Sequence, residues 1–241
     1  MNTDTPIGIV SMLFVLSGIF AALLIRSDLY KNPQPMKIMQ SVWTLTGLWG
    51  SWLALWAYRI LGKNRKTMDM PEMDMPGMKM DDTSIPDMKM PMRPLWQQIT
   101  LSTLHCGAGC TLADLIGEWF TFFIPVYIGG SLIAGQWVLD FILALVIGIY
   151  FQYAAIQSME RLTVKKALSK AFRADVLSLT SWQIGMYGWM AIVIFGINHG
   201  TPPEKNTWEF WFMMQIAMCF GFLTAWPVNK LLIRLGIKHG M

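Results

Sequence analysis

Six apolar runs, each about 20 residues long, limit this chain to a small set of folds. A helix of that length crosses the roughly 30 Å hydrocarbon layer of a bilayer, because it rises about 1.5 Å per residue. Hydrophobic residues make up 54% of the 241 residues and charged residues only 14%, whereas a soluble domain carries about 25% charged residues. The sequence therefore predicts an all-α polytopic membrane helix bundle with about six transmembrane helices. The predicted spans are residues 7–25, 39–61, 95–123, 136–158, 176–197 and 208–226.

The spans suggest three parts. Residues 1–62 should form a two-helix N-terminal membrane hairpin, residues 63–94 a linker, and residues 95–241 a four-helix membrane domain. The basic, partly amphipathic residues 160–173 should lie along the membrane surface, and Pro227 should stop the last span.

Charge sets the expected orientation and partners. Lysine and arginine gather in the second and fourth loops and in the tail. The positive-inside rule therefore predicts a bacterial inner-membrane protein with both termini and the linker in the cytoplasm. Basic residues are scattered at segment ends without an aromatic-interleaved patch, so the net charge of +4 indicates contact with membrane lipid and no nucleic-acid partner.

The linker carries the first chemical signal. From Met68 it reads MDMPE, MDMPG, MKMDD, TSIPD and MKMPM, and its prolines exclude a regular helix. Thioether sulfur is a soft, neutral ligand that selects Cu(I) over hard cations and needs no deprotonation. We expect a disordered metal-capture loop in which neighbouring methionines share one ion. Its candidate ligands are Met68, Met70, Met73, Met75, Met78, Met80, Met88, Met90 and Met92.

The third span carries a second group of metal-ligating residue types. Cys106, Cys110, Asp114 and Glu118 follow one another at intervals of four, so they share one helix face, and His105 lies beside them. Thiolate and imidazole suit Cu(I) or Zn(II), and the two carboxylates could couple protons or balance charge. The alternative is two small buried cysteines that only pack.

Two further methionine pairs fall near the centre of their spans. Met186 and Met190 share a face of the fifth span, and Met214 and Met218 share a face of the sixth. Helical methionine usually fills a core, so the pairs alone do not decide between core packing and metal binding. Together with the cysteines, they predict sulfur ligands at one membrane depth, which would suit a handover route for a soft cation.

The motif Thr103-Leu104-His105-Cys106-Gly107-Ala108-Gly109-Cys110 with Asp114, and the ending Ala225-Trp226-Pro227-Val228-Asn229 through Gly236-Ile237-Lys238, resemble a known bacterial membrane family. It is the multi-pass family named domain of unknown function 4396, and the resemblance covers residues 95–241. The methionine repeats look like those of copper-handling proteins. The Met-x3-Met pairs are similar to those of eukaryotic copper uptake channels, which have three spans per subunit, so only the type of ligand carries over.

These patterns predict a copper(I)-binding membrane protein for copper transport or resistance, with silver or zinc as other possible ions. It would be a transporter or metal-binding protein rather than an enzyme, alone, as a homo-oligomer or with a copper-handling partner. One alternative is a quinone-linked thiol–redox protein that uses Cys106 and Cys110. Another is a non-transporting protein that presents metal to a pump.

Overall fold

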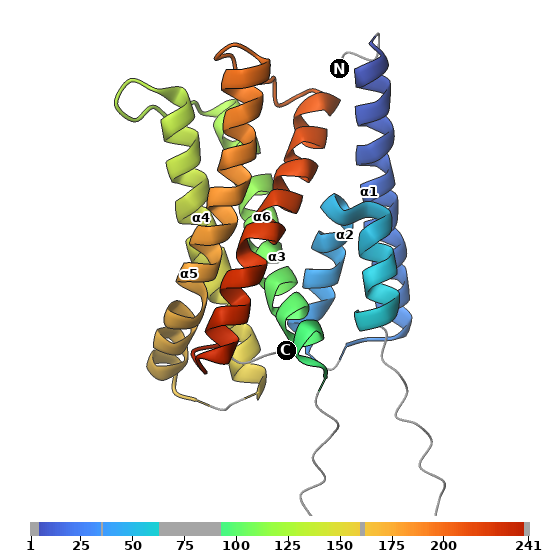
Figure 1. The fold of residues 1–241 in the computed structure, drawn as a ribbon, viewed down its shortest axis with the longest axis vertical. Helices are drawn as coiled ribbons and strands as arrows, with labels where there is room; N and C mark the ends of the chain where they lie inside the picture. Colours follow the sequence, from blue (N-terminus) through green and yellow to red (C-terminus); the bar gives the residue numbers. More distant parts are fainter. Residues whose placement is uncertain (1–4, 35, 63–92, 160–161, 239–241) are drawn as a thin grey trace, which may run out of the picture.

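The computed structural model describes residues 5–34, 36–62, 93–159 and 162–238. Within them, the regular structure is helical apart from one isolated bridge between Ile128 and Ser131, which confirms the predicted all-α bundle (Figure 1). The elements are α1 (Pro6–Lys31), α2 (Lys37–Ala57) with a π-helical turn η1 (Tyr58–Gly62), α3 (Leu95–Phe123), α4 (Leu132–Met159), α5 (Val164–Ala191) with a π-helical turn η2 (Ile192–Ile197), and α6 (Trp208–Arg234). The predicted metal-capture loop from Met68 to Met92 lies outside the described residues.

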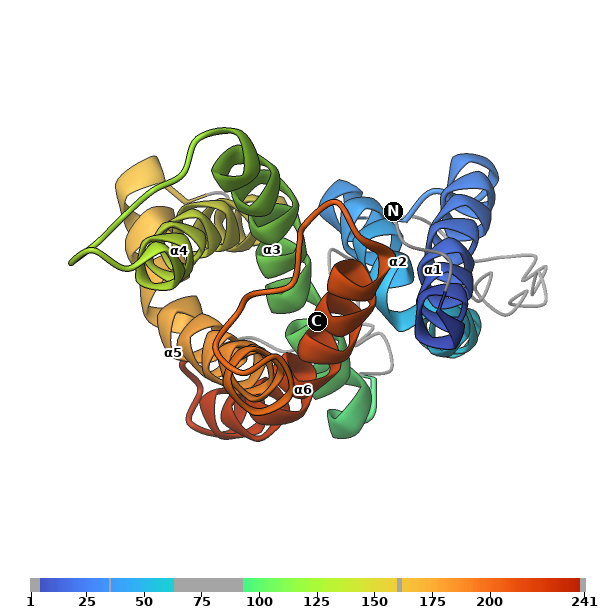
Figure 2. The same ribbon diagram turned by 90° about the horizontal axis from the view of Figure 1, so that it is seen from above.

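Four helices are long and apolar enough to cross a membrane, as judged by length and composition: α1, α3, α4 over residues 132–157, and α6. Of these, α3 is the central helix, because 78% of its apolar window is buried, against 28% for α1 and α4 and 33% for α6. Seen from above, α3 lies between α4 and α2 (Figure 2), and it contacts α2, α4, α5 and α6. It can therefore bury polar side chains away from lipid.

The helix α2 is the first arm of a re-entrant hairpin rather than a membrane span. The chain reverses at Ser51, whose φ of 45° and ψ of −122° are not helical. The rings of Trp43 and Tyr58 lie 5.4 Å apart, whereas an unbroken helix would place them about 22 Å apart. Gly62 also lies against Trp43, since a Cβ on Gly62 would be 2.6 Å from Trp43 Cε2. The predicted span 39–61 is therefore wrong: this segment enters the bundle partway and returns to the same end (Figure 1).

Helices α1 and α6 hold the tip of this hairpin. A helix that stops at Ser51 leaves the carbonyls of its last turn without helical donors. Gln215 Nε2 of α6 donates to one of them, Leu48 O, at 2.6 Å. Gly18 of α1 lies against the same carbonyl, where a Cβ would collide with it. Irregular backbone at membrane depth is tolerated where protein surrounds it, and Ser51 is only 9% exposed.

Because the segment of α2 and η1 returns to the end of the bundle at which it started, the start of α1 and the end of α6 do not lie together. Phe14 and Phe212 have their ring centroids 5.2 Å apart, so α1 and α6 start side by side and run in the same direction. The beginning of α1 and the end of α6 therefore lie at opposite ends of the bundle (Figure 1), which does not support the prediction that both termini share one side. We call the end at which α1 finishes, η1 finishes and α3 begins the basic end. Every described Lys and Arg except Lys205 belongs to a segment in that half.

Two predicted boundaries also differ from the structure. Of the predicted surface segment 160–173, residues 164–173 do not form a separate helix, because they are the first turns of α5. Helix α6 continues through Pro227 to Arg234. Proline removes one helical hydrogen bond, a loss that membrane helices tolerate where neighbouring helices surround them. The helix ends at Arg234, two residues before Gly236, whose φ of 68° is left-handed.

Candidate functional site

The inward face of α3 carries the predicted stripe. Cys106 is 1% exposed, Cys110 0%, Asp114 2% and Glu118 7%. Residues four apart in a helix lie one above another, so the stripe runs along α3 from the Cys106 turn to the Glu118 turn. Polar and thiol groups on a membrane helix normally face partners or cavities rather than lipid, and the structure places all four inside the bundle.

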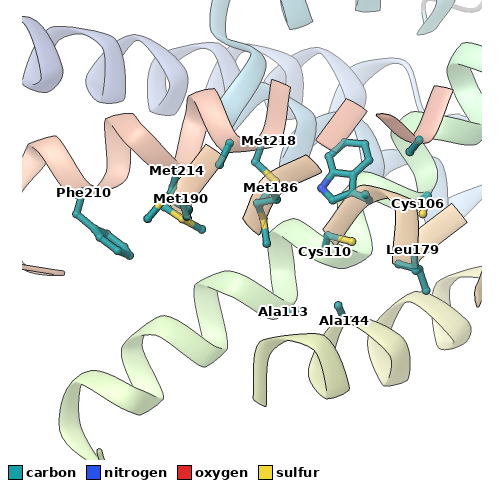
Figure 3. Packing of buried hydrophobic residues seen from close by; sticks show 13 residues of the cluster. Cys106, Cys110, Ala113, Ala144, Leu179, Met186, Met190, Phe210, Met214 and Met218 are labelled. Carbon is teal, nitrogen blue, oxygen red and sulfur yellow. The ribbon is translucent and has the colours of Figure 1, made fainter. Parts of the chain in front are cut away.

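The predicted sulfur pairs lie in one buried core. We define the sulfur cluster as Cys106 and Cys110 of α3, Met186 and Met190 of α5, and Met214 and Met218 of α6. None of the six side chains is more than 6% exposed. Met190 and Met214, and Met186 and Cys110, are members of this same core (Figure 3). The Thr111 hydroxyl of α3 also donates a 3.9 Å contact to Met218 Sδ.

Glycines bring the helices around the sulfur cluster close together. Gly109 of α3 lies against Gly148 of α4, where an added Cβ would be 2.8 Å from Gly148 Cα. Trp182 of α5, which is fully buried, fits between Gly107 of α3 and Gly221 of α6. A Cβ on Gly107 would be 2.7 Å from Trp182 Cζ2, and one on Gly221 would be 2.6 Å from Trp182 Nε1. Small residues at membrane helix contacts permit this close approach.

His105 faces a different environment from the two cysteines. Its ring is fully buried and lies 6.0 Å, centroid to centroid, from the ring of Phe151 in α4. Within the described ranges, no group of three or more His, Cys, Asp and Glu residues could hold a metal ion. A metal ion in the sulfur cluster would therefore need methionine thioethers as well as thiolates, and His105 is not placed to complete a His–Cys–Cys set.

A group of acidic residues follows the two cysteines along α3, toward the end opposite the basic end. We define the acidic cluster as Asp114 and Glu118 of α3 with Asp140 of α4. The Asp140 and Glu118 carboxyl groups lie within electrostatic range of each other, and Asp140 occupies the space that a side chain on Gly117 would fill. Asp140 is 2% exposed. We had not predicted Asp140, although a single carboxylate within an apolar span is itself a functional signal.

Lys205, from the loop between α5 and α6, neutralises part of this charge. Its ammonium forms an ion pair with Glu118 and donates to the hydroxyl of Thr121. Tyr187 of α5 lies within electrostatic range of the same carboxyls, and its hydroxyl donates to Trp137 O at 2.7 Å. One ammonium cannot balance three ionised carboxylates in a buried site, and uncompensated buried charge is very costly. This excess of buried negative charge favours protonated carboxyl groups in the acidic cluster.

A cavity of about 290 Å³ connects the two clusters. Because the hairpin reverses partway, its tip residues Leu48 and Trp49 line this space together with α1, α3 and α6. Met214 and Met218 of the sulfur cluster and Asp114 of the acidic cluster also line it. Both carboxylate oxygens of Asp114 are buried without a hydrogen-bond partner among the described residues. A small cation in this cavity could reach a carboxylate and two thioethers.

The family comparison covers the same helices. Residues 95–238 match the family described as a domain of unknown function (DUF4396). No curated protein and no solved structure matches the chain. All six residues of the sulfur cluster and all three of the acidic cluster lie within the matched region. The chain therefore belongs to the DUF4396 family, whose domain here consists of α3 to α6 and the segments that connect them.

Proposed function

We propose that this protein binds Cu(I) in the sulfur cluster and moves it within the membrane, in copper transport or resistance. The observation that carries the proposal is that two thiols and four thioethers, from three helices, belong to one buried core. Soft sulfur ligands select Cu(I), and neutral thioethers bind it without losing protons. Silver(I) would bind for the same reason, and zinc(II) would depend on the thiols and on harder ligands.

The methionine repeats would supply the ion at the basic end. Gly62 and Arg93, the residues that flank the segment, both form hydrogen bonds there. Gly62 O accepts from the side-chain amide of Gln34, and Arg93 Nη1 donates to Leu61 O at 2.8 Å. The positive-inside rule favours the basic end in the cytoplasm, because Lys205 is the one basic residue among the described ranges that belongs to the opposite half. Copper capture would then take place on the cytoplasmic side of a bacterial inner membrane.

The acidic cluster would balance charge when a cation moves. A monovalent cation near Asp114 replaces a proton with no change in net charge, so the two can exchange at little electrostatic cost. Lys205 holds Glu118 in place from the loop. Asp114 and Glu118 keep their proposed role in coupling, and Asp140 joins them.

Thiol–redox chemistry between Cys106 and Cys110 has less support. Residues four apart on a continuous helix have Cβ atoms about 5–6 Å apart, whereas a disulfide needs about 3.5–4.5 Å. Both thiols are also buried within α3. Thiol titration under oxidising and reducing conditions tests this alternative: a redox pair would lose two titratable thiols on oxidation.

The central experiment is anaerobic Cu(I) titration of the purified full-length protein against a chromophoric Cu(I) chelator. We expect tight binding that survives deletion of residues 68–92 but is lost in the variant Cys106→Ser, Cys110→Ser, Met214→Leu, Met218→Leu. Cys219→Ser is the matched control, because Cys219 lies on α6 outside the sulfur cluster. Unchanged Cu(I) affinity in the fourfold variant of the deleted chain would refute the proposed site.

Transport is tested separately from binding. Sealed vesicles that contain the protein and an enclosed copper indicator should respond to external Cu(I), and the fourfold variant should not. A protein that binds Cu(I) without this response would instead store the ion or present it to a pump.

A further inference from the structure

The end of α6 turns the tail back into the bundle. Gly236 adopts a left-handed φ of 68°. Gly236 N donates to Ile233 O at 3.1 Å, and Ile237 N donates to Leu232 O at 3.0 Å. These two bonds form a Schellman motif, which ends a helix and reverses the chain. The residue that follows, Lys238, is thereby directed toward the interior rather than toward solvent.

Lys238 forms a fully buried ion pair. Its Nζ lies 2.8 Å from Asp175 Oδ1 of α5, and both side chains are 0% exposed. The other carboxylate oxygen, Asp175 Oδ2, is buried without a hydrogen-bond partner among the residues that the structure describes. Long basic side chains near a helix end normally extend to water, so an ammonium held inside requires a specific anionic site.

Asp175 lies at the foot of the sulfur cluster. On α5, Asp175, Leu179, Trp182, Met186 and Met190 are three or four residues apart, so they share one face. Leu179 belongs to the same core as Cys106 (Figure 3), and Asp175 is one turn closer to the basic end. The charge of Asp175 also acts on His105 and Cys110 of α3.

We propose that Asp175 is the entrance site for a monovalent cation and that the Lys238 ammonium occupies and blocks this site while no cation is bound. The proposal rests on the proposed function for the identity of the cation, which is the ion that the sulfur cluster binds. A single buried carboxylate balances one positive charge, so an incoming cation and the Lys238 ammonium exclude each other. When the cation binds, the ammonium moves out to water at the basic end, and the turn at Gly236 provides the hinge.

The test measures access to the cluster thiols and uses no copper. In a Cys219→Ser background, only Cys106 and Cys110 can react with a charged, membrane-impermeant maleimide. Sealed membrane vesicles of both orientations are compared, and a C-terminal tag identifies the orientation that exposes the basic end. Lys238→Glu places a second carboxylate beside Asp175, and the repulsion between the two should move the tail out of the bundle. We expect the alkylation rate from the basic end to rise at least about tenfold, because reaction of a buried thiol follows the population of the open form.

Three further variants make the outcome decisive. Arg234→Glu changes an exposed charge in the same tail and should leave the rate unchanged. Lys205→Glu breaks the buried pair at the opposite end and should not raise the rate from the basic end. The charge-swapped variant Lys238→Glu, Asp175→Lys restores a pair and should restore protection.

The proposal is overturned if Lys238→Glu leaves the rate unchanged, if Lys205→Glu raises it equally from the basic end, or if the charge swap stays as reactive as Lys238→Glu. These results are independent of copper affinity, so failure of the closure and failure of the copper site are distinguishable.

Discussion

Gly109 sets the spacing of the two helices that carry the acidic cluster. A Cβ on Gly109 would lie 2.8 Å from Gly148 Cα and 3.2 Å from Gly148 N, whereas carbon atoms pack best at about 3.5–4.0 Å. The obstructing atoms are backbone, so no side chain can rotate away. In Gly109→Ala, α3 and α4 must separate by roughly 1 Å, and overpacking of this kind costs about 1–3 kcal/mol.

Thermal unfolding of the purified protein in detergent measures this cost. For a chain of this size, 1 kcal/mol shifts the melting temperature by about 2–4 °C, so we expect Gly109→Ala to melt roughly 2–12 °C lower. Gly188→Ala is the matched control, because Gly188 is an exposed glycine in α5 with nothing within 4 Å of an added Cβ. That variant should melt at the wild-type temperature or slightly above it. Equal melting temperatures for Gly109→Ala and Gly188→Ala would refute the close contact of α3 and α4.

Three further variants test other contacts by the same melting assay. Gln215→Leu removes the donor to Leu48 O, and we expect a loss of about 1–2 kcal/mol; no loss would mean that the hairpin tip is not held there. Lys205→Met leaves Glu118 without its ammonium, and removing one partner of a buried pair costs about 3–5 kcal/mol; a neutral effect would contradict the buried pair. Thr207→Ala removes the hydroxyl that caps α6 and should cost about 1 kcal/mol, whereas Thr207→Asn should be nearly neutral.

The bounds of α3 and the common helix face of each sulfur pair could be predicted from the sequence. The span predicted at 95–123 has the same bounds as α3, because a proline precedes it and the run that follows contains no proline and only two acidic residues, Asp114 and Glu118. The cysteine and methionine pairs were each four residues apart, which fixes a common helix face. A shared depth in the membrane then left them few positions except beside one another.

The hairpin and the polar partners could not be predicted in this way. Apolar residues have the same period whether a helix continues or reverses, so Gly50-Ser51 gave only a weak signal within an apolar run. Asp140 appeared as one carboxylate in a strongly apolar span, and its partner Glu118 lies on another helix. Lys238 looked like an ordinary basic tail residue, because its burial depends on the left-handed turn at Gly236.

The hydrogen bonds that Gln34 and Arg93 form beside residues 63–92 have a consequence for how the length of this segment can vary. The residues on either side of 63–92 are hydrogen-bonded to neighbouring points of the helical bundle. The packing of the helices therefore does not depend on the number of residues between them. Doubling a flexible loop costs only about 0.6 kcal/mol in closure entropy. Gain or loss of whole five-residue units would thus change the number of methionine thioethers available to bind a metal ion, while the fold stays intact.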